Sequence, residues 1–148
     1  MLKWHLIKRV RKKFKRGFKM NWDDYPNFSE EEFKCSCCGE TKMDPRTMAK
    51  IQELRTAFGK PLVVTSGYRC PNHPNEISRT EKGKVGSHGL GMAADFAVNG
   101  SDAYKLINLA FQLNFTGIGV NQKGNGRFIH LDDVQEYETI FRPVVWSY

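Results

Sequence analysis

Two short stretches of this chain carry three side chains that suit one divalent metal ion. Residues 87–96 read SHGLGMAADF, and residues 128–132 read FIHLD. His88, Asp95 and His130 offer imidazole nitrogens and a carboxylate oxygen, which Zn²⁺ accepts as ligands. A site with only three protein ligands keeps a fourth position for water, and metal-bound water ionises near neutral pH. A fold that brings the two stretches together would therefore contain a hydrolytic site.

The residues around these side chains favour such a site. Residues 92–98 are short and apolar, as expected of a buried strand, and Asp95 is their one charge. A lone carboxylate in a buried strand is costly unless it is paired or bound to a cation. Strand alternation puts His130 and Asp132 on one face, so Asp132 is expected to face the bound water as the general base. Taken singly, both histidines are equally well read as ordinary polar residues, and Asp95 as a cap.

The same stretches resemble the M15 family of zinc peptidases, which includes D-Ala-D-Ala carboxypeptidases and phage endolysins and shares its zinc-site architecture with hedgehog domains. Residues 87–95 match the family pattern S-x-H-x-x-G-x-A-x-D, with only the residue between Ser and His missing. Residues 66–69 (SGYR) and 128–132 (FIHLD) are similar to two further family segments, and residues 146–148 (WSY) resemble the ending of some phage members. The resemblance covers about residues 28–148.

By this resemblance His88, Asp95 and His130 are the zinc ligands. Arg69 would bind a substrate carboxylate or steady the developing oxyanion, and its plainer alternative is a surface ion pair. The resemblance implies a zinc-dependent peptidase that hydrolyses peptide bonds in bacterial cell-wall peptidoglycan, with the stem peptide as its partner. It leaves open whether the enzyme is a carboxypeptidase or an endopeptidase.

The general base is the point at which this chain departs from the family. Several branches place a catalytic acid three residues before the last histidine, where this chain has Arg127. Others place a second histidine two residues before it, where this chain has Phe128. Strand geometry favours Asp132 as the base, with Asp133 and Glu138 as weaker candidates.

The first 20 residues differ from the rest in charge. They hold nine Lys or Arg and no acidic residue, so removing these nine charges from the net +7 leaves −2 for residues 21–148. Their apolar residues fall on one side of a helical wheel, which is typical of an amphipathic helix on an anionic membrane or cell-wall surface. A solvated tail is the alternative. Nucleic acid is the less favoured partner, because a basic run alone is weak evidence for it.

We expect three parts: the basic segment at 1–20, a linker at 21–28, and a single zinc-peptidase domain at 29–148. No apolar run approaches the roughly 20 residues of a membrane span. Residues 1–20 also lack the apolar centre of a signal peptide. We therefore expect synthesis in the cytoplasm, by analogy that of a phage-infected bacterium, and action at the cell wall or from the virion.

Apolar periodicity and turn residues predict an α+β fold, with a small, mostly antiparallel sheet and helices packed on one side. Asp44 followed by a proline is a helix start, and Gly59 is the matching end. A second helix, with Phe111 facing inward, is expected to be capped by Ser101. Residues 70–86 should form a long loop. The expected elements are helices at 30–33, 45–58 and 102–113 and strands at 62–65, 92–98, 117–121, 127–132 and 141–146.

Four cysteines lie in two places in the sequence. Cys35 and Cys38 form a C-x-x-C, while Cys70 and His73 form a C-x-x-H. Three thiolates and one imidazole suit a second, closed zinc site. A disulfide from Cys70 to the cluster and free thiols are the alternatives, and a reducing compartment of synthesis favours metal over disulfides.

The leading hypothesis is thus a zinc-dependent peptidoglycan peptidase, acting as a phage endolysin or a virion-associated lysin. The alternative is a non-catalytic module that keeps the zinc and binds or structures the cell wall, as hedgehog domains suggest. A third hypothesis is a basic, nucleic-acid-associated protein with a cysteine zinc knuckle, which requires binding that weakens steeply with salt.

Overall fold

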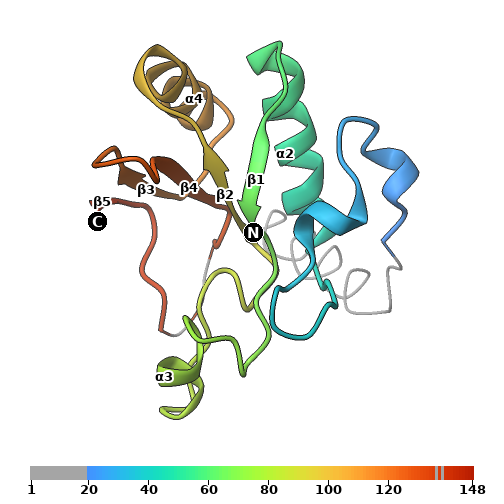
Figure 1. Cartoon of the computed structure of the whole chain (residues 1–148), viewed down its shortest axis with the longest axis vertical. Helices are drawn as coiled ribbons and strands as arrows, with labels where there is room; N and C mark the ends of the chain where they lie inside the picture. The colour runs from blue at the N-terminus through green and yellow to red at the C-terminus, as the bar shows by residue number, and fades with distance from the viewer. Residues whose placement is uncertain (1–19, 136, 138) are drawn as a thin grey trace, which may run out of the picture.

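The computed structural model describes residues 20–135, 137 and 139–148 and has an α+β fold (Figure 1). Five strands form one mostly antiparallel sheet, and helices α2 and α4 pack beside each other against one face. The predicted fold class is therefore confirmed. The elements are the 3₁₀ helices η1 (Trp22–Asp24) and η2 (Glu30–Phe33), then α2 (Pro45–Phe58), β1 (Val63–Ser66), α3 (Ile77–Thr80), β2 (Ala93–Ala97), α4 (Gly100–Gln112), β3 (Gly117–Asn121), β4 (Phe128–Asp132) and β5 (Val144–Ser147).

The sheet has the strand order β1-β2-β4-β3-β5, so β4 lies in the middle. Neighbouring strands are antiparallel, except that β3 and β5 run parallel. Paired residues of neighbouring strands share a face of the sheet. The pairing therefore aligns one row across all five strands, formed by Ser66, Asp95, His130, Gly119 and Trp146.

Strand alternation separates a core face from the face that carries this row. The neighbours of Asp95 and His130 along β2 and β4 are at most 1 % exposed and belong to one core cluster with residues of α2 and α4. Each large apolar side chain buried in this way contributes roughly 1.5–3 kcal/mol, so this face holds the domain together. The core-facing residues include Ala94, Phe96, Ile129, Leu131 and Ile118 of the sheet, with Met48, Ile51 and Leu106 of the helices.

Helix α2 begins and ends where the sequence predicts. The Asp44 carboxylate accepts hydrogen bonds from the backbone N–H groups of Arg46 and Thr47, both at 3.0 Å. Such a cap satisfies N–H groups that have no partner within the helix. Gly59 ends the helix in the left-handed conformation, with φ +82°. The predicted strands and the hairpin of β3 and β4 are also present, with ends shifted by a few residues.

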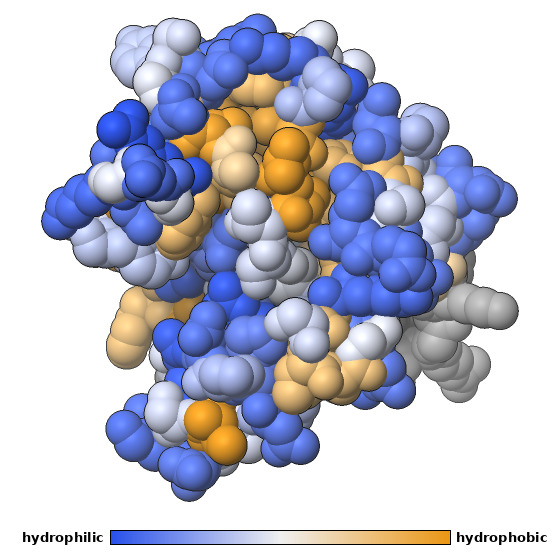
Figure 2. Space-filling model, in the orientation of Figure 1, coloured by the Kyte–Doolittle hydropathy of each residue, from blue (hydrophilic) through white to orange (hydrophobic). Residues whose placement is uncertain are grey.

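Several local predictions differ from the structure. The loop at 70–86 contains the single-turn helix α3, and the N-cap of α4 is Asn99 instead of Ser101. Phe111 is 56 % exposed, because Leu106 and Ala110 form the buried side of α4. The apolar residues at 62–65 predict a buried strand, but Val63 is 60 % exposed, because β1 lies at the edge of the sheet. Figure 2 shows hydrophobic side chains gathered over β1 and between β1 and α4, whereas the surface around α3 is mostly hydrophilic.

Residues 21–28, predicted as a linker, pack against the domain. Tyr25 and Phe28 are at most 8 % exposed, and the Trp22 ring lies 5.6 Å from that of Phe33. The Tyr25 hydroxyl donates a hydrogen bond to the carbonyl oxygen of Pro45 at 3.1 Å. These aromatic rings bury apolar area that a linker would leave in water. The predicted basic segment at 1–20 lies outside the described residues, apart from its last residue.

No helix in the part of the chain that the structure describes is both long and apolar enough to cross a bilayer.

The turn that precedes β2 is held against the start of α2. The backbone N–H of Asp44 donates to the carbonyl oxygen of Gly91 at 2.8 Å. Gly91 has φ +70°, and a β-carbon built on it would lie 1.9 Å from the carbonyl oxygen of Lys42. Both its backbone conformation and this close approach therefore require glycine.

We expect Gly91→Ala to lower the free energy of unfolding by about 3 kcal/mol or more, because left-handed strain of roughly 1–2 kcal/mol adds to a backbone clash. Gly124→Ala is the matched control, since Gly124 has φ +62° and nothing within 4 Å of an added β-carbon. It should show the conformational strain alone. Urea denaturation of both variants measures the difference, and equal losses would contradict the role given to the contact with Lys42.

Candidate metal centre

Three segments bring the predicted ligands together. Asp95 of β2 and His130 of β4 are direct cross-strand partners on the face opposite the core. His88 comes from the turn before β2, which is closed by backbone hydrogen bonds such as Met92 N–H to Ser87 O at 3.1 Å. All three ligand side chains belong to residues that are at most 6 % exposed. The structure thus gathers His88, Asp95 and His130 into one buried group.

The three candidate ligand atoms lie slightly closer together than they would around one zinc ion. His130 Nδ1 lies 2.9 Å from Asp95 Oδ1 and 3.1 Å from His88 Nε2. His88 Nε2 lies 3.3 Å from Asp95 Oδ1. Zn²⁺ binds such atoms tetrahedrally at about 2.0–2.2 Å, which separates them from one another by about 3.3–3.5 Å. The group therefore fits one zinc ion after a small outward movement of the ligands.

Outer hydrogen bonds decide which ring nitrogens face the centre. His88 Nδ1 lies 2.7 Å from the carbonyl oxygen of Gly67, which can only accept, so Nε2 carries the lone pair. His130 lies between two carboxylates, with Nε2 2.9 Å from Asp132 Oδ2 and Nδ1 2.9 Å from Asp95 Oδ1. When Nε2 donates to Asp132, Nδ1 is the His130 nitrogen that can bind a cation together with His88 Nε2 and Asp95 Oδ1. Metal-binding histidines usually have a backbone carbonyl or a carboxylate as the partner of their other ring nitrogen, as His88 and His130 have here.

The electrostatics of the group favour a cation in the same place. Burial lowers the pKa of His88. Burial acts in the same direction on His130, but its contacts with Asp132 and Asp95 outweigh burial and raise its pKa. Burial would raise the pKa of Asp95, yet the adjacent imidazoles hold it well below its usual range. Asp95 is thus ionised and His88 neutral at pH 7, which are the states that bind metal.

Arg69 closes one side of the group. Its Nη2 donates to Asp95 Oδ2 at 3.0 Å, and its Nε donates to Ser66 Oγ at 3.0 Å. The other carboxylate oxygen of Asp95 is left facing the two imidazoles. The Arg69 side chain is 15 % exposed and borders the cleft that leads to the site. The predicted SGYR segment thus brings Arg69 to the ligands, where it orients Asp95 as well as facing the cleft.

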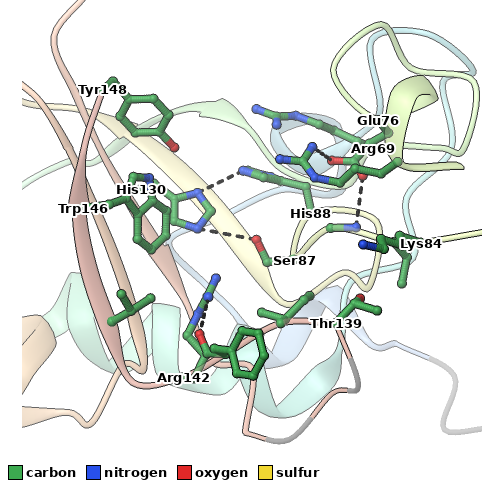
Figure 3. A pocket seen from close by; sticks show the side chains of 16 residues that line it. Arg69, Glu76, Lys84, Ser87, His88, His130, Thr139, Arg142, Trp146 and Tyr148 are labelled. Carbon is green, nitrogen blue, oxygen red and sulfur yellow. Dashed lines mark hydrogen bonds and ion pairs between the residues drawn. The ribbon is translucent and has the colours of Figure 1, made fainter. Parts of the chain in front are cut away.

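A cleft of about 450 Å³ opens onto the ligand group (Figure 3). Trp146 lies against the His130 ring, with 5.0 Å between the ring centroids. A β-carbon on Gly119, which separates these two residues in the cross-sheet row, would lie 2.7 Å from the Trp146 ring. The WSY ending therefore forms one wall of the site, a role that the motif alone did not indicate. The lining residues include Arg69, Glu76, His88, Arg142, Trp146 and Tyr148.

Glu76 is a buried charge at the cleft that sequence reasoning missed. It is 3 % exposed, and its Oε2 accepts a hydrogen bond from the backbone N–H of Gly86 at 3.1 Å. It also pairs with Arg79 at 3.6 Å. Glu76 thereby anchors the start of the turn that carries His88. Its sequence signal was absent, because the loop around it is mostly polar and has no apolar periodicity that would predict burial.

Comparison with known protein families agrees with this geometry. The family model described as Peptidase M15 matches residues 26–132, which is more than two thirds of the chain. The chain belongs to the peptidase M15 family. A comparison with curated proteins found no match. The resemblance inferred from the motifs is thereby confirmed, and the matched range includes His88, Asp95, His130 and Arg69.

Asp132 of this M15 domain has a different environment from the predicted one. It is fully buried, and its carboxylate contacts His130 Nε2, the nitrogen that faces away from the centre. Arg142 donates to both carboxylate oxygens, from Nε to Oδ1 at 2.8 Å and from Nη2 to Oδ2 at 2.5 Å. Burial would raise the pKa of Asp132, but Arg142 and His130 lower it to about 2. The carboxylate therefore does not face open water, and its contacts are those of a residue that positions His130.

The other candidate bases lie elsewhere. Asp133 binds the Lys50 ammonium and the Gln135 amide. Glu138 lies outside the described residues. Arg127, at the place of the acid that several family branches carry, is exposed and donates to the carbonyl oxygen of Gly124 at 2.9 Å. Asp133 therefore does not contribute its carboxylate to the ligand group.

The structure also brings three of the four residues of the predicted second zinc site together. Cys35, Cys38 and Cys70 form a second group with metal-ligand spacing. His73 is not part of this group. Its Nε2 lies 3.2 Å from Ser36 Oγ, and its Nδ1 accepts a hydrogen bond from the backbone N–H of Asn75.

We expect Asp132→Asn to weaken Zn²⁺ binding by about 10- to 100-fold, because outer partners of metal-binding imidazoles contribute that much. Competition with a chromophoric chelator measures the affinity. Asp133→Asn is the matched control, since this neighbouring carboxylate binds Lys50 and Gln135 instead, and should leave the affinity unchanged. Unchanged zinc affinity in Asp132→Asn together with lost hydrolysis would instead make Asp132 the general base.

Proposed function

We propose that this M15 domain is a zinc-dependent peptidase that hydrolyses peptide bonds in bacterial cell-wall peptidoglycan. The observation that carries the proposal is the convergence of His88 Nε2, Asp95 Oδ1 and His130 Nδ1 within 3.3 Å of one another, beside an open cleft. When bound there, Zn²⁺ supplies a Lewis acid for the scissile carbonyl and lowers the pKa of a coordinated water to about 7. Membership of a peptidase family supports the same reaction.

The chain's own residues hold the ligands in their binding-competent form. The carbonyl oxygen of Gly67 and the carboxylate of Asp132 each accept a hydrogen bond from the outer nitrogen of one imidazole. Arg69 fixes the orientation of Asp95 through Oδ2. Rigid placement of this kind means that little ordering remains to be done when substrate enters.

The charge of the cleft supports an anionic peptide as substrate. Its described lining carries several basic residues, whereas Glu76 is its one acidic side chain. Murein stem peptides carry free carboxylates, which a guanidinium binds through paired hydrogen bonds. Arg69 is the best-placed partner for such a carboxylate, because it borders both the cleft and the ligand group. The basic lining residues are Arg69, Arg79, Lys84 and Arg142.

Purified murein incubated with the zinc-loaded chain should release new amino groups. His130→Ala should reduce this release to the background rate, because it removes one of three metal ligands. His73→Ala is the matched control and should leave the rate unchanged, since His73 contacts Ser36 and Asn75 instead of the ligand group. A chelator should stop the wild-type reaction and added Zn²⁺ should restore it. No release from several murein chemotypes would count against the proposal.

A second candidate function is a zinc-containing module that binds or structures the cell wall without hydrolysis. It is favoured by the full engagement of Asp132 with Arg142 and His130. It is also favoured by Arg127 at the position where several family branches carry a catalytic acid. Such a module would keep the metal, bind wall fragments and release no amino groups, so the murein assay separates the two functions.

We also infer the setting in which the domain acts. The WSY ending, which resembles that of phage members of the family, favours a phage endolysin or a virion-associated lysin. Such a protein is made in the cytoplasm of an infected bacterium and acts at the cell wall. The nine cationic residues in the first 20 positions suit contact with an anionic wall or membrane surface, whereas nucleic acid is not a proposed partner.

Removal of residues 1–19 should weaken cosedimentation with purified sacculi or with anionic vesicles, and the two surfaces distinguish wall from membrane. Turnover of soluble stem-peptide fragments should stay unchanged, because the metal-facing residues all lie in the M15 domain. Raising the salt to roughly 0.5 M should erase the difference in binding, since exposed charges are then screened. Equal binding of the full and the shortened chain at low salt would contradict the inferred contact.

A further inference from the structure

A second group of potential metal ligands lies among residues that the proposed reaction does not use. The sulfur atoms of Cys35, Cys38 and Cys70 all lie within 4.8 Å of one another. Cys35 and Cys70 are buried, Cys38 is exposed, and the cysteines form no disulfide. All four cysteines of the chain belong to this region, because Cys37 lies between two of them in the sequence.

The backbone around Cys35 and Cys38 forms a tight turn. The N–H of Gly39 donates to the carbonyl oxygen of Cys35 at 2.8 Å, and Gly39 has φ +75°. The N–H of Cys35 donates to the carbonyl oxygen of Glu40 at 2.8 Å. A C-x-x-C on a turn points both sulfur atoms to one side, which is the spacing that structural zinc sites commonly use.

Backbone donors surround the Cys35 sulfur. The N–H of Cys70 donates to it at 3.2 Å, and the N–H groups of Cys37 and Cys38 also interact with it. A neutral thiol is a weak acceptor and does not need several donors. A thiolate does, and a buried thiolate also needs a cation beside it.

The arrangement suits a metal better than a disulfide. Sulfur atoms bound to one Zn²⁺ at about 2.3 Å in a tetrahedron lie about 3.8 Å apart, whereas a disulfide joins only two sulfurs at about 2.05 Å. A disulfide between any two of Cys35, Cys38 and Cys70 would leave the third sulfur beside it without a partner. A zinc ion uses all three.

Two neighbours compete for the fourth ligand position. Both ring nitrogens of His73 already have partners, Ser36 Oγ and the N–H of Asn75, so its ring would have to give up both contacts. Cys37 also lies outside the group of three, but it is exposed and directly precedes Cys38 in the chain. Cys37 would therefore join the group with a smaller loss of existing contacts than His73, the residue that the sequence analysis favoured as the fourth ligand.

We propose that Cys35, Cys37, Cys38 and Cys70 bind one structural Zn²⁺, separate from the ion at His88, Asp95 and His130. This site would join the turn after η2 to the segment that follows β1 (Figure 1). The two segments are already in contact, because the N–H of Tyr68 donates to the carbonyl oxygen of Phe33 at 3.0 Å. Gly67 and Arg69, which hold His88 and Asp95, lie within three residues of Cys70.

The test counts zinc in the full chain purified under reducing conditions. Wild type should contain about two Zn²⁺ per chain, and His88→Ala with His130→Ala should contain about one. Cys35→Ser and Cys37→Ser should each lose the cysteine-bound ion and keep the other, while His73→Ala, the matched control, should keep both. Loss of the ion from His73→Ala and its retention in Cys37→Ser would overturn the assignment of Cys37.

A second measurement uses proteins that keep all four cysteines, so it does not depend on cysteine variants that fail to fold. Co²⁺ in place of Zn²⁺ should give the charge-transfer absorption of thiolate ligands, in wild type and equally in the variant that lacks both histidines of the first site. Alkylation of the cysteines should be slow until a chelator is added. A disulfide found by mass spectrometry of the unreduced protein, or fast alkylation without chelator, would overturn the cysteine site. Neither result bears on the histidine site, so the two proposals fail separately.

Discussion

The pairing of Asp95 with His130 across β2 and β4 is the constraint on which the site depends. A slip of one residue would turn every side chain of a strand to the opposite face. The register is held by the core face of the same two strands, where Ala94, Phe96, Ile129 and Leu131 are buried. The burial that stabilises the fold therefore also places a carboxylate beside an imidazole on the other face of the sheet.

Around this pair, each metal-facing atom has its own outer partner. His88 is held by the carbonyl oxygen of Gly67, His130 by Asp132, and Asp95 by Arg69. These partners fix the orientation of the two rings and the carboxylate, so that one atom of each points toward the other two. The buried carboxylate of Asp132 is paired in the same way with Arg142, since a buried carboxylate needs a cation beside it.

The segment from Ser66 to Cys70 connects the two groups of potential metal ligands. Gly67 contacts His88 and Arg69 contacts Asp95, whereas the last residue of the segment belongs to the cysteine group. A β-carbon on Gly67 would lie 2.6 Å from the backbone of Phe33, so the segment is pressed against η2. A metal ion bound by Cys70 would therefore also restrict the movement of Gly67 and Arg69, which orient His88 and Asp95.

The sequence by itself determined the family, the α+β class, the ends of helix α2 and the identity of the converging residues. These depend on local signals: apolar periodicity, capping residues, and ligand types at a set spacing. The tertiary structure alone decided that Asp132 lies behind His130, that Tyr25 and Phe28 belong to the core, and that Glu76 and the WSY ending border the cleft. Strand alternation predicted which face of the sheet Asp132 is on but not its partner, because Arg142 lies ten residues further along the chain, just before β5, which pairs with β3. Contacts between segments that are distant in sequence do not produce a periodic pattern, so the sequence alone does not predict them. These contacts distinguish a residue that faces the substrate from one that holds a ligand in place.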